Sequence, residues 1–192
     1  MDQNYGYVKA APQNSSPLSS KMLIIIGASV VAILLAFVLL LSSNTNNTTA
    51  QAQHLSLRMA NLQTILSDTD TTRRLKNQQL SDLVASFSLT HTSDINDLQT
   101  ALAPQLPEKF DEKIIANELD NSTKDKLEEA YLKNKLDAAY AGVLTDKISS
   151  LQALIAELYG KTKDQKLKQT LETINDHLRK TSKKIDSISI SN

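Results

Sequence analysis

The sequence predicts an all-α protein in which an N-terminal transmembrane helix carries an exported helical bundle. Residues 22–41, MLIIIGASVVAILLAFVLLL, contain no charge and no proline. As a helix this run would span the hydrocarbon core of a bilayer, which is about 30 Å thick. Glycine and proline number four each, a composition that favours helices over sheets. Near the C-terminus, apolar positions alternate steps of four and three at Leu167, Leu171, Ile174, Leu178, Thr181, Ile185 and Ile188, which indicates a helix with one packed seam.

Residues 1–21 are rich in Asn, Gln, Ser and Pro and predict a short disordered tail. Lys9 and Lys21 precede the apolar run, and the next basic residue is Arg58. By the positive-inside rule we expect a cytoplasmic tail and an extracytoplasmic C-terminal domain on a single-pass protein of the cell membrane. The alternative is a signal peptide cut after Ala50-Gln51-Ala52. The apolar run exceeds the roughly 7–15 residues of a signal core, so we expect it to be retained as an anchor in the lipid bilayer.

Residues 42–53, SSNTNNTTAQAQ, have no charge and no large apolar side chain. They predict a flexible stalk, followed by a helical bundle domain over residues 54–190. The first helix of that domain places Leu55, Met59, Leu62 and Leu66 on one face.

Caps and breaks divide the rest of the predicted bundle. Asp68 or Asp70 is expected to cap a second helix over 71–88, and Ser93 or Asp94 a third helix that ends before Pro104. A short piece over 108–119 follows, and then the longest helix, over 123–159 with Asn134 as a polar break. Gly160 is expected to end that helix, and Thr162 with Gln165 to form a capping box for the last helix. The last two helices predict a long antiparallel hairpin.

The chain carries 21 basic and 21 acidic residues, so its net charge favours no class of partner. Residues 161–184, however, contain eight basic and three acidic residues, a net charge of 8 − 3 = +5. No aromatic side chain lies beyond Tyr159 to stack on bases, which argues against nucleic acid as a partner. The candidate interaction surface consists of basic residues of this segment: Lys161, Lys168, Arg179, Lys180, Lys183 and Lys184.

The residues that usually carry chemistry do not form a recognisable set. Cysteine is absent, so disulfides and thiolate sites are excluded. The three histidines, His54, His91 and His177, lie in different segments and match no metal motif. We therefore predict no catalytic residue, cofactor or metal, and a protein that is not an enzyme.

The layout of polar tail, single span, Ser/Thr/Asn stalk and helical domain resembles membrane-anchored proteins of small-genome, candidate-phylum bacteria. The stretches SLTHTSDINDL, which ends at Leu98, and LDAAYAGVLTDKISSLQALIAELY, over 136–159, carry the resemblance. It implies a location in a bacterial envelope and no catalytic residues.

Together these patterns lead us to expect an interaction or structural module of the envelope that binds another protein or a second copy of itself. The alternative is a bundle that binds a small apolar or anionic ligand. A cavity lined by Tyr131, Tyr140 or the basic helix would favour that alternative, and a packed core would count against it.

Overall fold

The computed structural model describes residues 47–103, 106, 112–120 and 122–189. These residues form seven helices and no strand, which confirms the all-α class for this part of the chain. The predicted tail, the predicted span over 22–41 and residues 42–46 of the predicted stalk lie outside the described residues.

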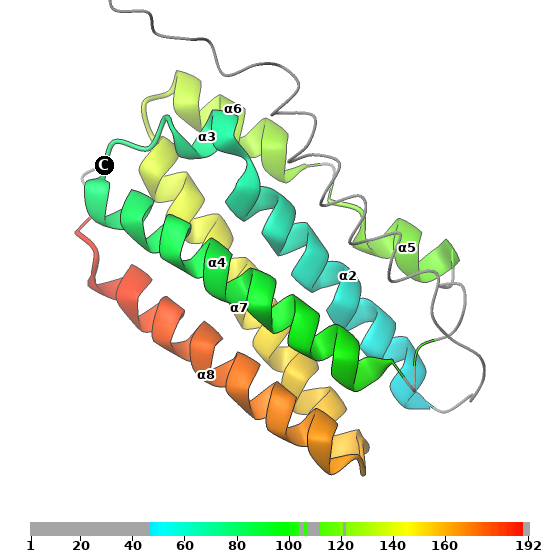
Figure 1. Cartoon of the computed structure of the whole chain (residues 1–192). Helices are drawn as coiled ribbons and strands as arrows, with labels where there is room; N and C mark the ends of the chain where they lie inside the picture. The colour runs from blue at the N-terminus through cyan, green and yellow to red at the C-terminus, as the bar shows by residue number, and fades with distance from the viewer. Residues whose placement is uncertain (1–46, 104–105, 107–111, 121, 190–192) are drawn as a thin grey trace, which may run out of the picture.

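Four long helices form a bundle: α2 (Asn47–Ser67), α4 (Gln78–Leu102), α7 (Leu136–Lys161) and α8 (Gln165–Ser187). As Figure 1 shows, α2 packs on α4 and α7, and α8 packs on the same two helices. The pair α2 and α8 therefore lies on one diagonal of the bundle, and α4 with α7 on the other.

Hydrogen bonds between helix ends fix the directions of these four helices. Gln51 in the first turns of α2 donates to Glu157 in the last turns of α7, at 3.2 Å. Asn77, which precedes α4, donates to the carbonyl of Ser189 after α8, at 3.1 Å. Each long helix therefore runs antiparallel to both of its neighbours, and the diagonal partners α4 and α7 are parallel.

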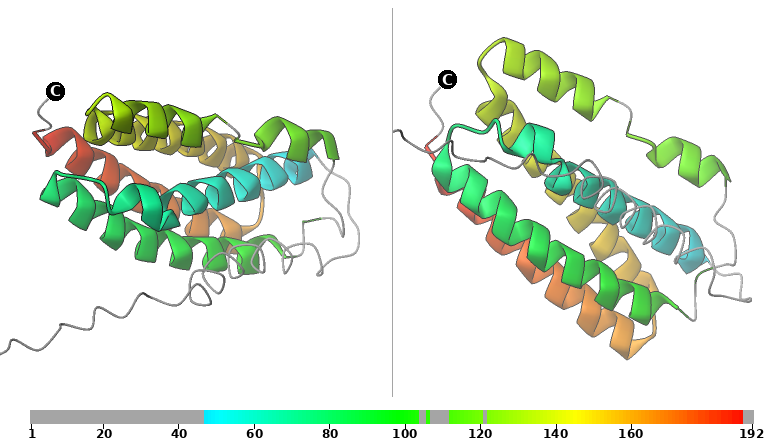
Figure 2. Two further views of the ribbon diagram at one scale, coloured as in Figure 1. Left: turned by 90° about the horizontal axis from the view of Figure 1, so that it is seen from above. Right: turned by 45° about the horizontal axis from the view of Figure 1, so that its top comes forward.

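Because α4 and α7 point the same way, the chain must return along the bundle between them. A single long connection of this kind is a known variant of the four-helix bundle. The return path, which we call the crossover (residues 103–135), includes α5 (Glu112–Glu118) and α6 (Thr123–Leu132). α5 packs on α2 and α6 on α7, so the crossover covers the α2–α7 side of the bundle (Figure 2).

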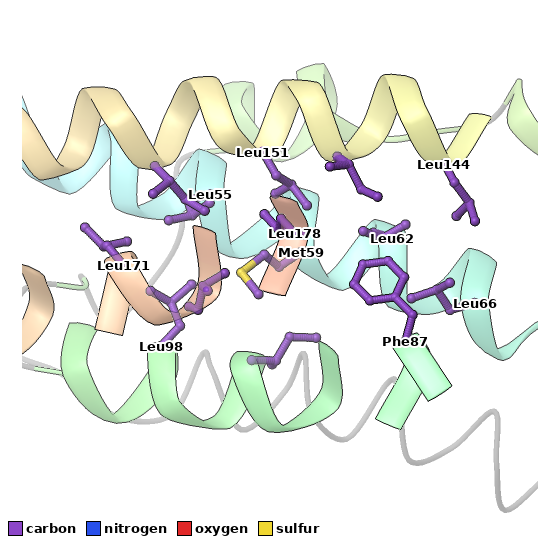
Figure 3. Packing of buried hydrophobic residues seen from close by; sticks show 14 of the residues in the cluster. Leu55, Met59, Leu62, Leu66, Phe87, Leu98, Leu144, Leu151, Leu171 and Leu178 are labelled. Carbon is purple, nitrogen blue, oxygen red and sulfur yellow. The ribbon is translucent and has the colours of Figure 1, made fainter. Parts of the chain in front are cut away.

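The interior is filled by aliphatic side chains from all four long helices (Figure 3). Every seam position predicted on the last helix from Leu167 to Ile185 is at most 8% exposed, which confirms that seam. The first predicted face is confirmed as well. Its four members are buried in the same core: Leu55, Met59, Leu62 and Leu66.

The predicted boundary between stalk and domain is wrong. Residues 47–53 were expected to belong to the flexible stalk, but they form the first two turns of α2. Ala52 is fully buried and Gln53 is 5% exposed. Burial against neighbouring helices outweighs the weak helix propensity of Asn and Thr in this stretch.

The second and third predicted helices also have wrong bounds. Asp68 caps only the short α3 (Thr69–Thr72), accepting from the amides of Asp70 and Thr71. Asn77 caps α4 by accepting from the amide of Leu80, and α4 then runs unbroken to Leu102. The expected break near residue 93 does not occur, and the carboxylate of Asp94, one of the two expected caps, instead lies 2.8 Å from His177 on α8.

The longest predicted helix, over 123–159, is two helices, α6 and α7. They part at Asn134, the expected polar break, which adopts a left-handed φ of 57°. Asn is among the few side chains that tolerate this conformation. The amide of Lys135 bonds to the carbonyl of Ala130 at 2.8 Å, which closes the turn between the helices.

Both predicted caps of the final turn are wrong. Gly160 has no positive φ and α7 continues to Lys161. Asp164, not Thr162, caps α8 by accepting from the amides of Lys166 and Leu167. The Thr162 hydroxyl instead accepts from the amide of Asp164. The carboxylate is the stronger acceptor and its charge favours the positive end of the helix dipole.

Two leucines on α4 provide a matched test of the core. Leu98 is 1% exposed and Leu89 is 77% exposed. Leu98→Ala is expected to lower the free energy of unfolding by about 2–5 kcal/mol, because it leaves a cavity between helices. Leu89→Ala should change it by less than about 0.5 kcal/mol. Denaturant unfolding of the full chain in detergent micelles, followed by circular dichroism, measures both, and equal losses would contradict the packing.

The break between α6 and α7 is tested by two substitutions at Asn134. Both remove the bond at 2.5 Å from Lys76 to its side chain, so their difference isolates backbone strain. Asn134→Val should be less stable than Asn134→Gly by about 1–2 kcal/mol, because a β-branched side chain resists positive φ. The same unfolding measurement applies, and equal stability of the two variants would contradict the left-handed turn.

Candidate functional site

The most extensive polar network of the described residues joins the crossover to the bundle. Glu118, at the end of α5, accepts from Arg58 and lies beside His54, both at 2.7 Å and both on α2. Its side chain is 9% exposed. Arg58 also donates to Ser150 on α7, and Asn61 donates to the backbone carbonyl of Glu118. We call this network the crossover clamp.

A second ion pair continues the crossover clamp toward α6. Lys147 on α7 lies 2.6 Å from Asp120. The same carboxylate accepts from the amide and the hydroxyl of Thr123 in the first turn of α6. Burial alone would raise its pKa, but the bonds from Lys147 and Thr123 hold the pKa of Asp120 at about 2. Asp120 is therefore ionised throughout the physiological range.

These groups line a half-open hollow of about 410 Å³ between α2, α5, α6 and α7. Burial again opposes ionisation of Glu118, but its bonds from Arg58 and His54 lower the pKa of this carboxyl. Arg58 and Lys147 are both engaged with carboxylates of the crossover. Because Arg58 is paired with Glu118 and Lys147 with Asp120, these four charged groups are best suited to hold the crossover in place.

A buried polar pair joins α4 to α8. Asp94 is 2% exposed, and its Oδ1 lies 2.8 Å from Nδ1 of His177. Its second oxygen, Oδ2, has no hydrogen-bond partner among the described residues. Burial raises the pKa of Asp94, although His177 acts in the opposite direction. An ionised Asp94 at this buried position therefore lowers the stability of the folded protein.

His91 lies one turn before Asp94 and is fully buried. Burial lowers the pKa of His91 to about 4, so the ring is neutral at physiological pH. Its Nε2 donates to the carbonyl of Met59 on α2, at 2.9 Å, and its ring packs on Phe87 with centroids 5.4 Å apart. This environment gives His91 a structural role in joining α4 to α2.

A second hollow, of about 390 Å³, lies at the end of the bundle where α4 and α7 begin. Arg74 stacks over the ring of Tyr131 at 4.6 Å and bonds to Glu128 at 2.8 Å. Asp137 accepts from the amides of Lys76 and Asn77, both at 2.9 Å. Lys135 also lines the hollow, which gives it a basic rim.

The basic residues predicted as an interaction surface fall into two groups on α8 and the turn before it. Lys161 bonds to Glu157 at 2.6 Å, and Lys168 lies 5.0 Å from the centre of the Tyr159 ring. Arg179 and Lys180 both bond to Asp176. Lys183 and Lys184 are exposed. Eleven residues separate Lys168 from Arg179, about 16 Å along a helix, so the two groups cannot form one compact site.

Large apolar side chains are exposed mainly on the crossover. Of the five such residues in the described part of the chain, only Leu89 lies on a long helix. Leu119 and Leu132 are 60% and 76% exposed. The other two are less exposed, Ile115 at 37% and Tyr131 at 42%. Ile115 precedes Leu119 by one helical turn, and Tyr131 adjoins Leu132, so the four form two pairs.

No known protein family, curated protein or solved structure matches the chain. The resemblance to proteins of small-genome bacteria stays a prediction. In the described ranges, no group of three or more His, Asp or Glu side chains is placed to hold a metal ion. No helix in the same ranges is both long and apolar enough to cross a bilayer.

The sequence analysis did not identify the crossover clamp. Its partners are 60 and 64 positions apart in the chain, so no local spacing brings them together. The only local signal is the excess of acidic residues over positions 82–129, eleven against four basic residues, but that pattern does not single out Glu118 or Asp120.

The crossover clamp is tested by two substitutions on α5. Glu118→Gln should leave Arg58 without its carboxylate and cost about 1–3 kcal/mol, because a half-buried charged donor loses its partner. The exposed Glu112 provides the matched control, Glu112→Gln, with little effect. Hydrogen exchange of α5 amides measures the change, and equal exchange in both variants would contradict the clamp.

Asp94→Asn tests the buried pair. The raised pKa means that the folded state holds the Asp94 proton more tightly than the unfolded state. The contribution of this group to stability therefore falls as pH rises from its unfolded pKa, about 4, through the folded value. At pH 7 Asp94→Asn should be the more stable protein, and its advantage should vanish at low pH. Denaturant unfolding at pH 7 and at low pH measures this, with Asp82→Asn, an exposed site on α4, as control.

Proposed function

We propose that the protein is a membrane-anchored, non-enzymatic interaction module of the cell envelope whose helical bundle binds a protein partner. Residues 22–41 would hold the chain in the cell membrane, with the tail cytoplasmic and the bundle extracytoplasmic. The partner would be another envelope protein or a second copy of the chain.

The observation that carries this proposal is the exposure of apolar side chains on the crossover. Apart from Leu89, the leucines of the long helices are buried or partly buried, whereas Leu119 and Leu132 remain 60% and 76% exposed. Exposed apolar side chains that lie together commonly mark surfaces for another protein. The crossover is fixed to the bundle by Glu118 and Asp120, so it would present these side chains on a rigid support.

The charges of the crossover clamp support a binding role over a catalytic one. Arg58, Glu118, Asp120 and Lys147 are engaged with one another or with their neighbours. A catalytic acid or base would instead need a pKa near the working pH and access to a substrate. The low pKa of Asp120 and Glu118 suits permanent ion pairs.

The proposal is tested by photo-crosslinking the full chain in the membranes of its host. A photo-reactive amino acid at position 119 or 132 should give a defined adduct, and one at the equally exposed position 89 should not. With the photo-reactive amino acid at position 132, Leu119→Asp should reduce adduct formation at least about tenfold, because a charged side chain opposes apolar burial, whereas Leu89→Asp should not. Equal adducts from all three positions, or turnover of an envelope substrate by the purified chain, would contradict it.

A second candidate function is favoured by the hollow beside Tyr131. Its basic rim of Arg74, Lys76 and Lys135 is suited to a small anion. Tyr140 does not contribute, because it is fully buried and donates to the carbonyl of Ile65 at 3.0 Å. Calorimetric titration with inorganic phosphate, compared between the full chain and Lys135→Gln, tests this alternative. If the full chain gives no heat of binding, the alternative is ruled out.

A further inference from the structure

The end of the bundle where α2 begins also holds the turn between α7 and α8. Gln51 in α2 contacts Glu157 in α7 at this end. The turn carries three exposed lysines, Lys161, Lys163 and Lys166. In Figure 1 it lies at the lower right, near the first turns of α2.

The length of chain before α2 limits how far this end can lie from the apolar run. Leu41 ends that run, and α2 begins at Asn47. Six residue steps reach at most about 20 Å, whatever their conformation. The 26 residues of α7 extend about 39 Å. The end with the α7–α8 turn is therefore the end that the anchor holds near the membrane surface.

The charge of this end suits an anionic surface. From 157 to 168 four lysines accompany two acidic residues, Glu157 and Asp164, a net of 4 − 2 = +2, and Glu157 bonds to Lys161 at 2.6 Å. The Asp164 carboxylate accepts from two amides in the first turn of α8, so it points into the helix end. The first turn of α2 and the last turn of α4 carry no charged residue.

We propose that the α7–α8 turn docks on anionic lipid head groups of the membrane that holds the anchor. The inference rests on the anchoring in the proposed function. Lysine side chains within a Debye length of an anionic leaflet, about 8 Å at physiological salt, are attracted to it. The short tether keeps the turn close enough to the leaflet for the lysines to reach that range. The bundle then stands on its end, with Tyr131 and Leu132 at the opposite end, directed away from the lipid.

The natural absence of cysteine makes the geometry measurable with single labels. Gly160→Cys places a label beside the lysines, where an added Cβ meets nothing within 4 Å. Ser187→Cys places one in the exposed last turn of α8, at the far end. The full chain is reconstituted into phosphatidylcholine vesicles with or without about 30% phosphatidylglycerol. A quencher attached to lipid head groups then reports the distance of each fluorophore from the surface.

In the anionic vesicles we expect at least about threefold stronger quenching at 160 than at 187. In neutral vesicles the ratio of the two should fall toward one. At about 1 M salt, where the Debye length is about 3 Å, the difference should also fall. Lys161→Gln with Lys163→Gln and Lys166→Gln should abolish it. The matched triple of Lys180→Gln, Lys183→Gln and Lys184→Gln, at the far end of α8, should leave it unchanged.

Separate outcomes distinguish this inference from the anchoring on which it rests. If the chain does not float with vesicles after an alkaline wash, the anchoring fails and the docking with it. If the chain floats but quenching at 160 ignores vesicle charge and the lysine triple, only the docking is overturned; an acidic protein partner for these lysines would give this result. Equal quenching at 160 and 187 would mean that the bundle lies on its side, which also overturns the docking.

Discussion

Between α4 and α7 the chain has to travel back along the whole bundle, because these two helices are parallel and lie on a diagonal. The crossover is the result, and most of the polar surface follows from it. It lies over α2 and α7, where Glu118 and Asp120 bond to Arg58 and Lys147. It also carries two exposed leucines, Leu119 and Leu132. A bundle whose four helices followed one another through short turns would have no such layer.

Three polar side chains inside the bundle each join two helices. His91 links α4 to α2, Tyr140 links α7 to α2, and Asp94 links α4 to α8. Buried polar groups cost free energy unless they are bonded, and these bonds require the helices to meet at a particular height. Aliphatic side chains alone would allow the helices to slide along one another, so the polar links fix the register of the helices. These links cost some free energy of folding, because Oδ2 of Asp94 is buried without a hydrogen-bond partner among the described residues.

The parts of the fold that could be predicted from the sequence are those with a local period. The seam of α8 repeats over seven positions, and all but the last are buried. Helix ends were predicted less well, because several polar residues compete for each cap and tertiary contacts decide between them. Asp164 caps α8 in place of the predicted Thr162, and Asn77 caps α4 in place of the predicted Asp70. The side chains that pair with the Glu118 carboxylate lie 60 and 64 positions away from it in the chain. The basic residues were found as a run, but helix rise separates them into two groups.

The turns of the bundle also bear on how the chain folds. α7 and α8 are joined by only the three residues 162–164, and α2 and α4 by the segment 68–77 with α3. Closing short loops costs little conformational entropy, so each antiparallel pair can form from neighbouring segments of the chain. Bringing the pairs together requires closure of the 33-residue crossover, from 103 to 135. The ion pairs of Glu118, whose partners lie 60 and 64 positions away, therefore form only when this long loop closes.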